Sequence, residues 1–338
     1  MEKIKVAVIG CGTIAPMHLD AIKTMEKLQL VAVCDSKEER AIHTANVYHT
    51  NAYTDYHEMF EQEQLDAVHL CLPHYLHTVV AEEAFRKGIH VLCEKPMSIS
   101  YEDAVSAVNL AEECKVQYGV VFQGRYNTHA QGVKQRIMEG KLGTVRGANA
   151  LLMWHRSEDY YTISDWKGTW EKEGGGVLIN QAIHTLDLAN WFVDDTPVKV
   201  QASMHNRMHP HIEVEDIAEG LITYQKGAIV SFYYTNNSLV DEPFEIRLLC
   251  EKGRVLISAE EAKLFYNDGT SETILNVPHK NASGTHGKAY WGTRHGDQIY
   301  QFYQAILGNE PLEVSGKEAL KTQKLVCEIY KEAKRRFS

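Results

Sequence analysis

The residues from Ile4 to Phe122 alternate short runs rich in valine, isoleucine and leucine with segments whose apolar residues recur at helical spacing. Near-continuous apolar strands separated by helices of about 10–15 residues are typical of a parallel sheet that is covered on both faces. This region therefore predicts a doubly wound α/β domain. Its predicted strands are Ile4–Ile9, Leu30–Cys34, Ala67–Leu72, Ile89–Leu92 and Gln117–Phe122, and its predicted helices are Ile14–Met25, one from about Lys37, Leu76–Lys87 and Tyr101–Cys114.

From about Gln123 the pattern changes to strands spaced like hairpins, with Lys226-Gly227 and Lys252-Gly253 as turn signals. A chain of 338 residues is long enough for two domains with separate cores. We expect an α/β domain over 1–122 and an α+β domain over 123–338 with a mostly antiparallel sheet, whose last helix can pack back on the first domain. The predicted strands there are Val145–Met153, Val198–Met204, Ile217–Tyr224, Ala228–Thr235, Glu245–Cys250 and Gly253–Ser258, and the predicted helices are His129–Glu139, Val177–Phe192, Asp297–Leu307 and Lys317–Phe337.

The composition argues against several classes of protein. A formal net charge of −10 disfavours nucleic acid as a partner, because phosphate backbones are bound by basic surfaces. No apolar stretch approaches the ~20 residues that a membrane span needs. The seven cysteines are scattered without a C-x-x-C pair, which disfavours a disulfide framework or a zinc ribbon. Because the strand pattern begins at the N-terminus and leaves no room for a signal segment, we expect a cytoplasmic protein.

The first chemical motif lies between the first predicted strand and the first predicted helix. It reads Gly10-Cys11-Gly12-Thr13-Ile14-Ala15, the GxGxxA form of the dinucleotide fingerprint. Gly10 permits the tight turn, and Gly12 lets the backbone approach a pyrophosphate at the helix N-terminus. We expect Gly10, Gly12, Thr13 and Ile14 to contact a bound dinucleotide.

The kind of dinucleotide depends on the end of the second predicted strand. Asp35 follows the glycines by roughly 20 residues, where a carboxylate accepts hydrogen bonds from the adenosine ribose. A carboxylate repels a 2′-phosphate, which favours NAD. Ser36 and Lys37 follow directly and can tolerate that phosphate, so NADP stays as the alternative.

Polar residues follow two further predicted strands, at the edge where ligands bind in open α/β sheets. A lysine before a proline is kept out of the helical region, so the Lys95 side chain is directed away from the next helix. Its ammonium can hydrogen-bond a substrate hydroxyl. A solvated surface lysine is the usual alternative, but the place of Lys95 at the carboxyl end of a predicted strand favours the functional interpretation. The residues expected at the cofactor are Leu72, Pro73, His74, His77, Glu94 and Lys95, with His77 equally able to serve as a helix-entry residue.

A glycine-rich entry at 174–176 leads into the predicted helix Val177–Phe192. Asn180, His184 and Asp187 recur at i, i+4 and i+7 and therefore share one helix face, which we expect to line a cleft. Removal of hydride from an alcohol carbon requires a base for the hydroxyl proton, and a histidine suits that task at neutral pH. The alternative is three satisfied core residues. One histidine with Asn and Asp lacks the usual zinc spacing, so no metal is expected.

Together these motifs resemble the Gfo/Idh/MocA oxidoreductase family over essentially the whole chain. The resemblance implies a Rossmann-like first domain, a second domain with a large open sheet that makes the interface of a homo-oligomer (a dimer or tetramer), and a cis peptide bond before Pro96. It implies that Lys95 is the catalytic lysine, His184 the general acid/base and Asp187 a supporting carboxylate. Many members have Asp where this chain has Asn180, so a proton relay would depend more heavily on His184.

The segment Trp154–Trp170 combines aromatic and polar residues. Aromatic faces stack on sugar rings, and Arg156 or Lys167 can meet an acidic or phosphorylated group. This segment resembles the sugar-oxidising branch of the family, although the tryptophans can equally pack against the other domain. The expected substrate contacts are Lys95, Trp154, Arg156, Trp166, Asn180 and His184, and a weaker late cluster is Tyr290, Trp291, Arg294 and His295.

The leading hypothesis is an NAD(P)-dependent dehydrogenase or reductase that acts on a hydroxyl or keto carbon of a sugar, sugar derivative or cyclic polyol. One alternative is a non-catalytic dinucleotide sensor that acts through a protein partner. Another is an NAD-dependent glycosidase, which oxidises, eliminates and re-reduces without net redox change. A sensor needs neither Lys95 nor His184, which speaks against it.

Overall fold

In the computed structural model, which describes residues 3–277 and 294–335, the apolar runs of the first 120 or so residues form one parallel sheet. The strand order is β3-β2-β1-β4-β5-β6, so the chain reverses its direction of winding between β1 and β4. This order confirms the predicted doubly wound α/β fold. The strands are β1 (Ile4–Ile9), β2 (Leu28–Cys34), β3 (Asn51–Tyr53), β4 (Ala67–Leu70), β5 (His90–Cys93) and β6 (Tyr118–Val120).

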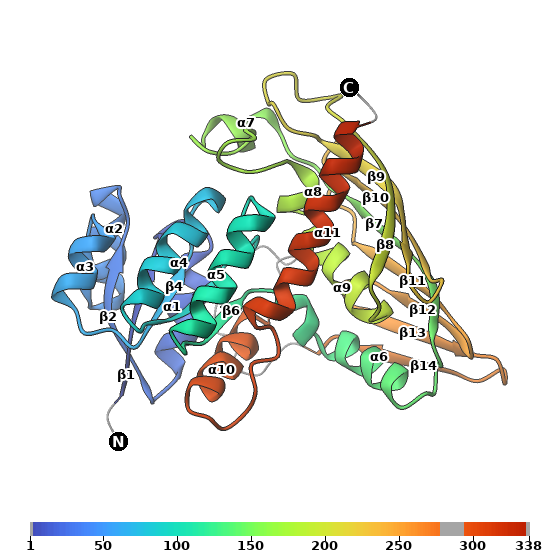
Figure 1. Ribbon diagram of the computed structural model, residues 1–338, viewed down its shortest axis with the longest axis horizontal. Coiled ribbons are helices and arrows are strands. Elements are labelled where there is room, and N and C mark those ends of the chain that lie inside the picture. Colours follow the sequence, from blue (N-terminus) through green and yellow to red (C-terminus); the bar gives the residue numbers. More distant parts are fainter. Residues whose placement is uncertain (1–2, 278–293, 336–338) are drawn as a thin grey trace. The chain divides into compact units, whose positions relative to one another are not determined.

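Helices cover this sheet in the alternating order that the sequence predicts (Figure 1). They are α1 (Ala15–Thr24), α2 (Glu38–Tyr48), α3 (Tyr56–Gln62), the 3₁₀ turn η1 (His74–Leu76), α4 (His77–Arg86) and α5 (Tyr101–Glu113). Neither β3 nor α3 was predicted from the sequence. The three residues of β3 are half or fully exposed, so this edge strand lacks an apolar run.

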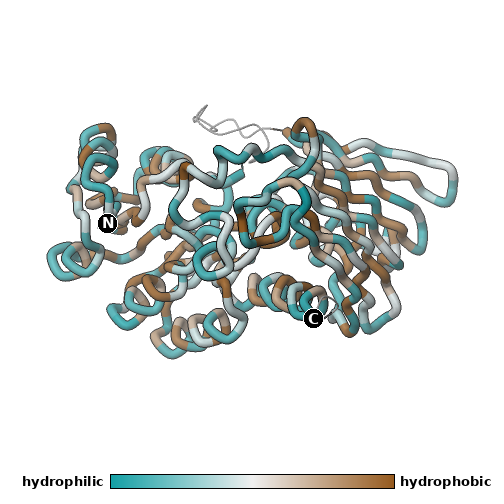
Figure 2. The backbone as a smooth tube through the Cα atoms, turned by 90° about the horizontal axis from the view of Figure 1, so that it is seen from above, coloured by the Kyte–Doolittle hydropathy of each residue, from teal (hydrophilic) through white to brown (hydrophobic). Residues whose placement is uncertain are grey.

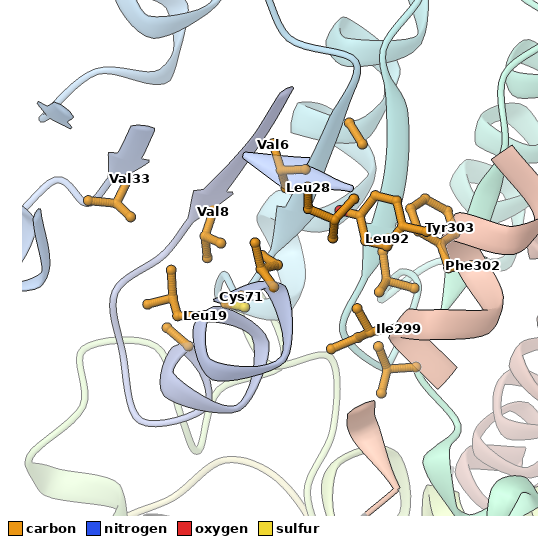
Figure 3. Close-up of a cluster of buried hydrophobic side chains, with 14 of the residues drawn as sticks. Val6, Val8, Leu19, Leu28, Val33, Cys71, Leu92, Ile299, Phe302 and Tyr303 are labelled. Atoms are coloured by element: carbon orange, nitrogen blue, oxygen red, sulfur yellow. The ribbon is translucent and has the colours of Figure 1, made fainter. Parts of the chain in front are cut away.

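The first core lies between β1 and the helices on one face of the sheet, and Figure 3 shows its side chains. Val6 and Val8 of β1 meet Leu19 of α1, and all three are at most 1% exposed. Phe302 and Tyr303 enter the same cluster from α10 (His295–Ile306), far along the chain. Burial of a side chain of this size stabilises a fold by roughly 1.5–3 kcal/mol, so this cluster fixes α1 and α10 firmly.

The second sheet has eight strands in the order β14-β13-β12-β11-β7-β10-β9-β8. All neighbouring pairs are antiparallel except β7 with β10. Apolar and polar segments alternate along these strands (Figure 2), as expected for a sheet with one buried face. The strands are β7 (Val145–Met153), β8 (Pro197–His205), β9 (Ile217–Tyr224), β10 (Ile229–Thr235), β11 (Glu245–Cys250), β12 (Gly253–Ile257), β13 (Glu261–Tyr266) and β14 (Ser271–Leu275).

Among the described residues, the helices that pack on the second sheet lie on one of its faces (Figure 1). Helix α9 packs on β7 and β11, and α6 packs on β12, β13 and β14. The helices of this part are α6 (Thr128–Met138), which follows the 3₁₀ turn η2 (Gln123–Tyr126), α7 (Glu158–Thr162), α8 (Val177–Asn180) and α9 (Ile183–Val193). On the uncovered face, Leu221, Ile229 and Leu249 are 43–61% exposed.

The contacts divide the chain into two compact units, 1–123 with 279–320 and 124–278 with 321–338. Within the first unit α10 packs on α1 and β5, and Ser315 forms a bridge to Gly119 of the edge strand β6. The last helix, α11 (Gly316–Arg335), starts in the first unit and continues in the second. Its range agrees with the predicted Lys317–Phe337 within two residues. Over the described ranges, no helix is both long and apolar enough to span a bilayer.

Candidate active site

The loop after β1 has the backbone that a dinucleotide needs. Gly10 has a φ of 95°, and a Cβ there would lie 2.2 Å from the Cys71 carbonyl oxygen, so only glycine fits. A Cβ on Gly12 would meet nothing within 4 Å. The packing of this chain therefore does not require glycine at position 12, whereas a pyrophosphate approaching the backbone does. Thr13 is exposed, Ile14 is half-buried, and no side chain forms a capping hydrogen bond at the start of α1. The helix dipole favours an anion near this end of the helix.

Alanine substitutions should separate these two roles. Gly12→Ala should leave the thermal midpoint of unfolding close to that of the wild type and weaken NAD binding at least tenfold, because the added methyl group occupies the place of the pyrophosphate. Gly10→Ala should instead lower the midpoint, since its Cβ overlaps backbone and its φ is strained. Thermal unfolding measures the midpoint of each variant, and cofactor fluorescence measures its affinity for NAD. A Gly12→Ala protein that binds NAD normally would rule out this loop as the pyrophosphate site.

Asp35 lies at the end of β2, beside the glycine loop. Its Oδ2 accepts a hydrogen bond from the Cys11 amide and its Oδ1 accepts one from the Lys37 amide, each 2.9 Å long. The side chain is half-buried, so part of the carboxylate stays accessible. The two amides orient the carboxylate, whose remaining lone pairs can accept ribose hydroxyls.

His77 holds two loops together. Its ring is fully buried; Nδ1 lies 2.6 Å from the Pro96 carbonyl oxygen and Nε2 lies 2.9 Å from that of Leu72. A direct cofactor contact was expected for His77, but its burial excludes one, so its effect on the cofactor is indirect. His74 is also buried at the start of η1, whereas Leu72 and Pro73 are half-buried and able to contact a ligand.

Lys95 is the accessible residue of a buried segment. Residues 91–98 are otherwise buried, including Glu94 and Pro96, while Lys95 is half-exposed. The Lys95–Pro96 peptide bond is cis, as the family resemblance implies. The end of β5 thus presents the Lys95 side chain on the ligand side of the first sheet.

Gly175 and Gly176, directly before α8, are required by packing. A Cβ on Gly175 would lie 2.0 Å from the Tyr330 hydroxyl, and one on Gly176 would lie 1.8 Å from the Glu215 carbonyl oxygen. The Glu215 carboxylate accepts hydrogen bonds from the amides of Gly176 and Leu178 and from Tyr330. Burial raises the pKa of Glu215 to about 7. This loop is therefore closed by protein groups and is not a second phosphate site.

The helix that follows is broken. The sequence predicted one helix, Val177–Phe192, but α8 ends at Asn180 and α9 begins at Ile183. The Gln181 side chain lies at the break, where its amide nitrogen donates to the Tyr160 hydroxyl and its oxygen accepts from Asn236. These contacts fix the break, and neither Gly nor Pro marks it in the sequence.

The break separates the three residues that the sequence placed on one helix face. Asn180 is half-exposed, and His184 is one of only two residues of α9 that are not buried, the other being Trp191. Asp187 is 1% exposed and faces inward, where Arg125 donates two hydrogen bonds of 2.7 and 2.8 Å and Thr322 donates one of 2.7 Å. The expectation that Asp187 lines the site is therefore corrected: its ion pair holds α9 in place.

Sequence reasoning missed Tyr160 and Glu173. The Asn180 amide nitrogen lies 2.6 Å from Glu173 Oε1 and 3.2 Å from the Tyr160 hydroxyl. Glu173 is 1% exposed, and burial raises its pKa to about 7. The ammonium of Lys167 lies 3.6 Å from the centre of the Tyr160 ring. The available signal was the position of Glu173 directly before the glycines, since a carboxylate is seldom buried without a task.

Some side chains of the segment Trp154–Trp170 are buried and bonded within the protein. Trp154 is 9% exposed, and its indole nitrogen donates to the Glu242 carbonyl oxygen. Arg156 is buried over the Trp154 ring and forms a 2.9 Å ion pair with Asp241. Trp166 and Lys167 are half-buried. Trp166 and Lys167 are therefore better placed to contact a substrate than Trp154 and Arg156.

His209 links the segment Trp154–Trp170 to Asp216. Its Nδ1 lies 3.0 Å from Asp216 Oδ2 and its Nε2 lies 2.7 Å from the Arg156 carbonyl oxygen. Because both neighbours are acceptors, the protonated ring makes both bonds. The hydrogen bond to Asp216 raises the pKa of His209 above its ordinary value of 6.5. Burial opposes ionisation of Asp216, but the donors His209, Met208 and Arg207 lower its pKa below 3.8.

This pair should make stability depend on pH. The contribution of His209 is fully present below pH 6.5 and is lost as pH rises through its folded pKa, and that of Asp216 is present above pH 3.8 and lost as pH falls. The His209→Asn substitution should therefore lower the thermal midpoint more at pH 5 than at pH 9. The exposed His211→Asn is the control. An equal loss at both pH values would show that His209 is neutral in the folded state.

The late cluster is only partly covered by the structure. Arg294 forms a 2.6 Å ion pair with Asp297, and His295 Nε2 lies 3.7 Å from Glu94 Oε1. Tyr290 and Trp291 lie outside the described residues. Across residues 3–277 and 294–335, no three His, Cys, Asp or Glu side chains come together as metal ligands would.

Comparison with known proteins matches both parts of the chain to one family. Residues 4–122 match the model of an oxidoreductase family with an NAD-binding Rossmann fold, GFO/IDH/MocA, and residues 130–256 match the model of the GFO/IDH/MocA C-terminal domain.

D-glucoside 3-dehydrogenase of Escherichia coli is 26% identical over 98% of this chain and 95% of its own length. D-apiose dehydrogenase of Paraburkholderia graminis is 26% identical over 99% of this chain and 88% of its own length. The crystal structure of the WlbA dehydrogenase from Bordetella pertussis, in complex with NADH and UDP-GlcNAcA, is 28% identical and superposes with a TM-score of 0.85 over 98% of this chain and 97% of that one.

Proposed function

Because the chain belongs to the GFO/IDH/MocA family of oxidoreductases, whose first domain binds NAD, we propose that it moves a hydride between NAD and a hydroxyl-bearing carbon of a sugar, sugar derivative or cyclic polyol. Lys95 and His184 are the proposed catalytic pair. The observation that carries this proposal is their exposure. Each is an accessible polar residue in an otherwise buried segment, Lys95 after β5 and His184 in the first turn of α9.

The chemistry of the two side chains suits the reaction. His184 takes the proton from the substrate hydroxyl, and the Lys95 ammonium donates a hydrogen bond to the same oxygen as negative charge develops on it. NAD, when bound, supplies the acceptor for the hydride. Asn180 is an amide and accepts no proton, so its task is to orient the substrate beside His184. Glu173 and Tyr160 hold the Asn180 amide group in place.

The substrate class rests on the relatives and on the aromatic segment. Two relatives are named for oxidation of a glucoside and of apiose, and the solved WlbA structure contains UDP-GlcNAcA. In this chain Trp166 offers a ring face for a sugar, and the nearby ammonium of Lys167 is suited to an acidic or phosphorylated substituent. We therefore place the substrate among sugars and their acidic derivatives.

The test of this function follows the nicotinamide absorbance with NAD and with NADP, across a panel of sugars, inositols, sugar acids and nucleotide sugars. Reduction of NAD by at least one panel member is the expected result, with NADP slower because Asp35 repels its 2′-phosphate. Sugar release from a glycoside without net NADH would indicate the glycosidase instead. Tight NAD(H) binding without turnover of any panel member would indicate the sensor.

The open face of the second sheet supports a homo-oligomer. Ile229 and Leu249 flank Gly147 in one row across β10, β7 and β11, and both side chains are at least 50% exposed. An apolar row on an uncovered sheet is typical of a surface that pairs with a second copy. We propose that this face joins the protomers of a dimer or tetramer.

Light scattering should therefore give a mass above that of one chain of 38.3 kDa. The double variant Ile229→Lys with Leu249→Lys should shift the protein to monomers, because charges there would be buried without partners. Val198→Lys, at an exposed residue at the start of β8, is the control. A monomeric wild type would exclude the proposed interface.

A further inference from the structure

Four polar side chains meet inside the first unit, where apolar packing is otherwise the rule. They come from α1, β4, the end of β5 and α10, and each is at most 7% exposed: His18, His69, Glu94 and Tyr303. The Tyr303 hydroxyl lies 2.8 Å from His69 Nε2, His69 Nδ1 lies 2.8 Å from His18 Nδ1, and His18 Nε2 lies 3.0 Å from Glu94 Oε1. Tyr303 also belongs to the buried apolar cluster drawn in Figure 3. The four groups form a continuous chain of hydrogen bonds that ends at the residue before Lys95.

The chain of hydrogen bonds has a direction. An ionised Glu94 only accepts, so a neutral form of His18 carries its proton on Nε2 and accepts at Nδ1. His69 must then donate from Nδ1 and accept at Nε2, which makes the Tyr303 hydroxyl the donor. The mirror arrangement, with every bond reversed, requires a protonated Glu94. In this arrangement the Tyr303 hydroxyl and the Glu94 carboxylate are coupled through the His69 and His18 rings.

The surroundings favour the ionised arrangement. Burial by itself would raise the pKa of Glu94, but the hydrogen bond from His18 and the nearby His295 and Lys95 side chains lower it to about 2. Burial lowers the pKa of His69 well below 6.5, which favours a neutral ring. Titratable groups face this row from every packed element. They are His18 on α1, Asp66, His69 and Cys71 at β4, Cys93 and Lys95 at β5, and Tyr303 and His295 on α10.

Glu94 is joined to the loop that carries Lys95. Its Oε2 accepts a hydrogen bond of 3.3 Å from the Lys95 amide, and His77 contacts the Pro96 carbonyl oxygen on the other side of Lys95. The Lys95 backbone is thus held from both sides. A protonated Glu94 would be a weaker acceptor for that amide and would no longer attract the ammonium of Lys95.

We propose that Tyr303 and His69, acting through His18, keep Glu94 ionised and so position Lys95 for hydride transfer. None of the three touches the reacting atoms, so they are positioning residues. The proposal rests on the catalytic role of Lys95 proposed above.

Three substitutions test the chain of hydrogen bonds. Tyr303→Phe keeps the ring and removes the donor at its far end. His69→Leu removes both nitrogens, whereas His69→Asn keeps an amide donor near the place of Nδ1. Tyr118→Phe is the matched control, because Tyr118 is another buried tyrosine of this unit and its hydroxyl has no hydrogen-bond partner among the described residues.

The expected kinetic result is a fall in kcat of about tenfold or more for Tyr303→Phe and His69→Leu, the scale of a displaced catalytic group, with KM for NAD within about twofold. The acidic limb of the kcat profile should move to higher pH in both variants. His69→Asn should recover most of the lost rate, and Tyr118→Phe should match the wild type. Unchanged kcat and pH profile in folded Tyr303→Phe and His69→Leu would overturn the proposal.

Nuclear magnetic resonance of ¹⁵N-labelled histidine provides a readout that does not depend on turnover. Signals that disappear in His69→Asn and in His18→Asn identify the two rings, and the wild type should show bare His69 Nε2 and bare His18 Nδ1. Opposite tautomers, or a protonated His69 at pH 7, would overturn the proposal directly. Full activity of Lys95→Met would instead contradict the proposed function and leave the tautomer result standing, so the two failures are distinguishable.

Discussion

Lys95→Met should reduce kcat by about 10²–10⁴-fold while the protein folds and binds NAD as the wild type does. The reason is that methionine keeps the length of the side chain but cannot donate a hydrogen bond to the oxygen that becomes an alkoxide. Lys95 is half-exposed in a buried segment, so its loss removes a functional group rather than packing. Steady-state kinetics with the sugar selected from the panel, together with cofactor fluorescence, measures both quantities.

The matched control is Lys87→Met, which removes an exposed ammonium just after α4 in the same unit. Its kinetics should equal those of the wild type. A Lys95→Met protein that retains more than a few per cent of wild-type kcat would exclude Lys95 from the chemical step.

Asp187→Ala should lower the free energy of unfolding by about 3–5 kcal/mol, the usual result of removing one partner of a buried ion pair. Arg125 is 3% exposed and directs two nitrogens at Asp187, so the substitution leaves its guanidinium buried without this carboxylate. Because the pair holds α9, activity should fall together with stability. Denaturant unfolding monitored by circular dichroism provides the measurement.

Glu328→Ala is the control, since Glu328 pairs with Lys324 on the surface of α11, where an ion pair contributes little. The double variant Arg125→Met with Asp187→Leu should recover part of the lost stability, because it leaves no buried charge. If Asp187→Ala were as stable as the wild type but inactive, Asp187 would belong to the chemistry and not to the support of α9.

The fold followed from the sequence wherever periodicity was strong. The strands of the first sheet, except β3, match predicted apolar runs because a parallel strand is buried on both faces. The hairpin of β13 and β14 was missed, although Asp268-Gly269 between them is a strong two-residue turn signal. Burial alternates along β13, which weakens any apolar run.

The site was less predictable than the fold because its arrangement depends on contacts distant in sequence. Motif spacing identified Lys95, Asn180 and His184 as site candidates, and their exposure in the structure supports that role. Spacing on one helix could not show that Asp187 turns towards Arg125, which lies 62 residues away. Nor could it show that Tyr303 reaches His69 across 234 residues. Burial and pairing of polar groups are decided by tertiary structure, which periodicity does not encode.

The most direct measurement follows deuterium from the substrate to the nicotinamide. The sugar selected from the panel is deuterated at successive hydroxyl-bearing carbons, mixed with NAD and each of wild type, His184→Ala and His211→Ala, and the NADH is analysed by mass spectrometry. We predict that one position transfers its deuterium to NADH, with the wild type and the exposed-histidine control His211→Ala alike and His184→Ala slower by about 10²–10⁴-fold. Substrate consumption with no deuterium in the nicotinamide pool, or His184→Ala transferring it at the wild-type rate, would contradict the account.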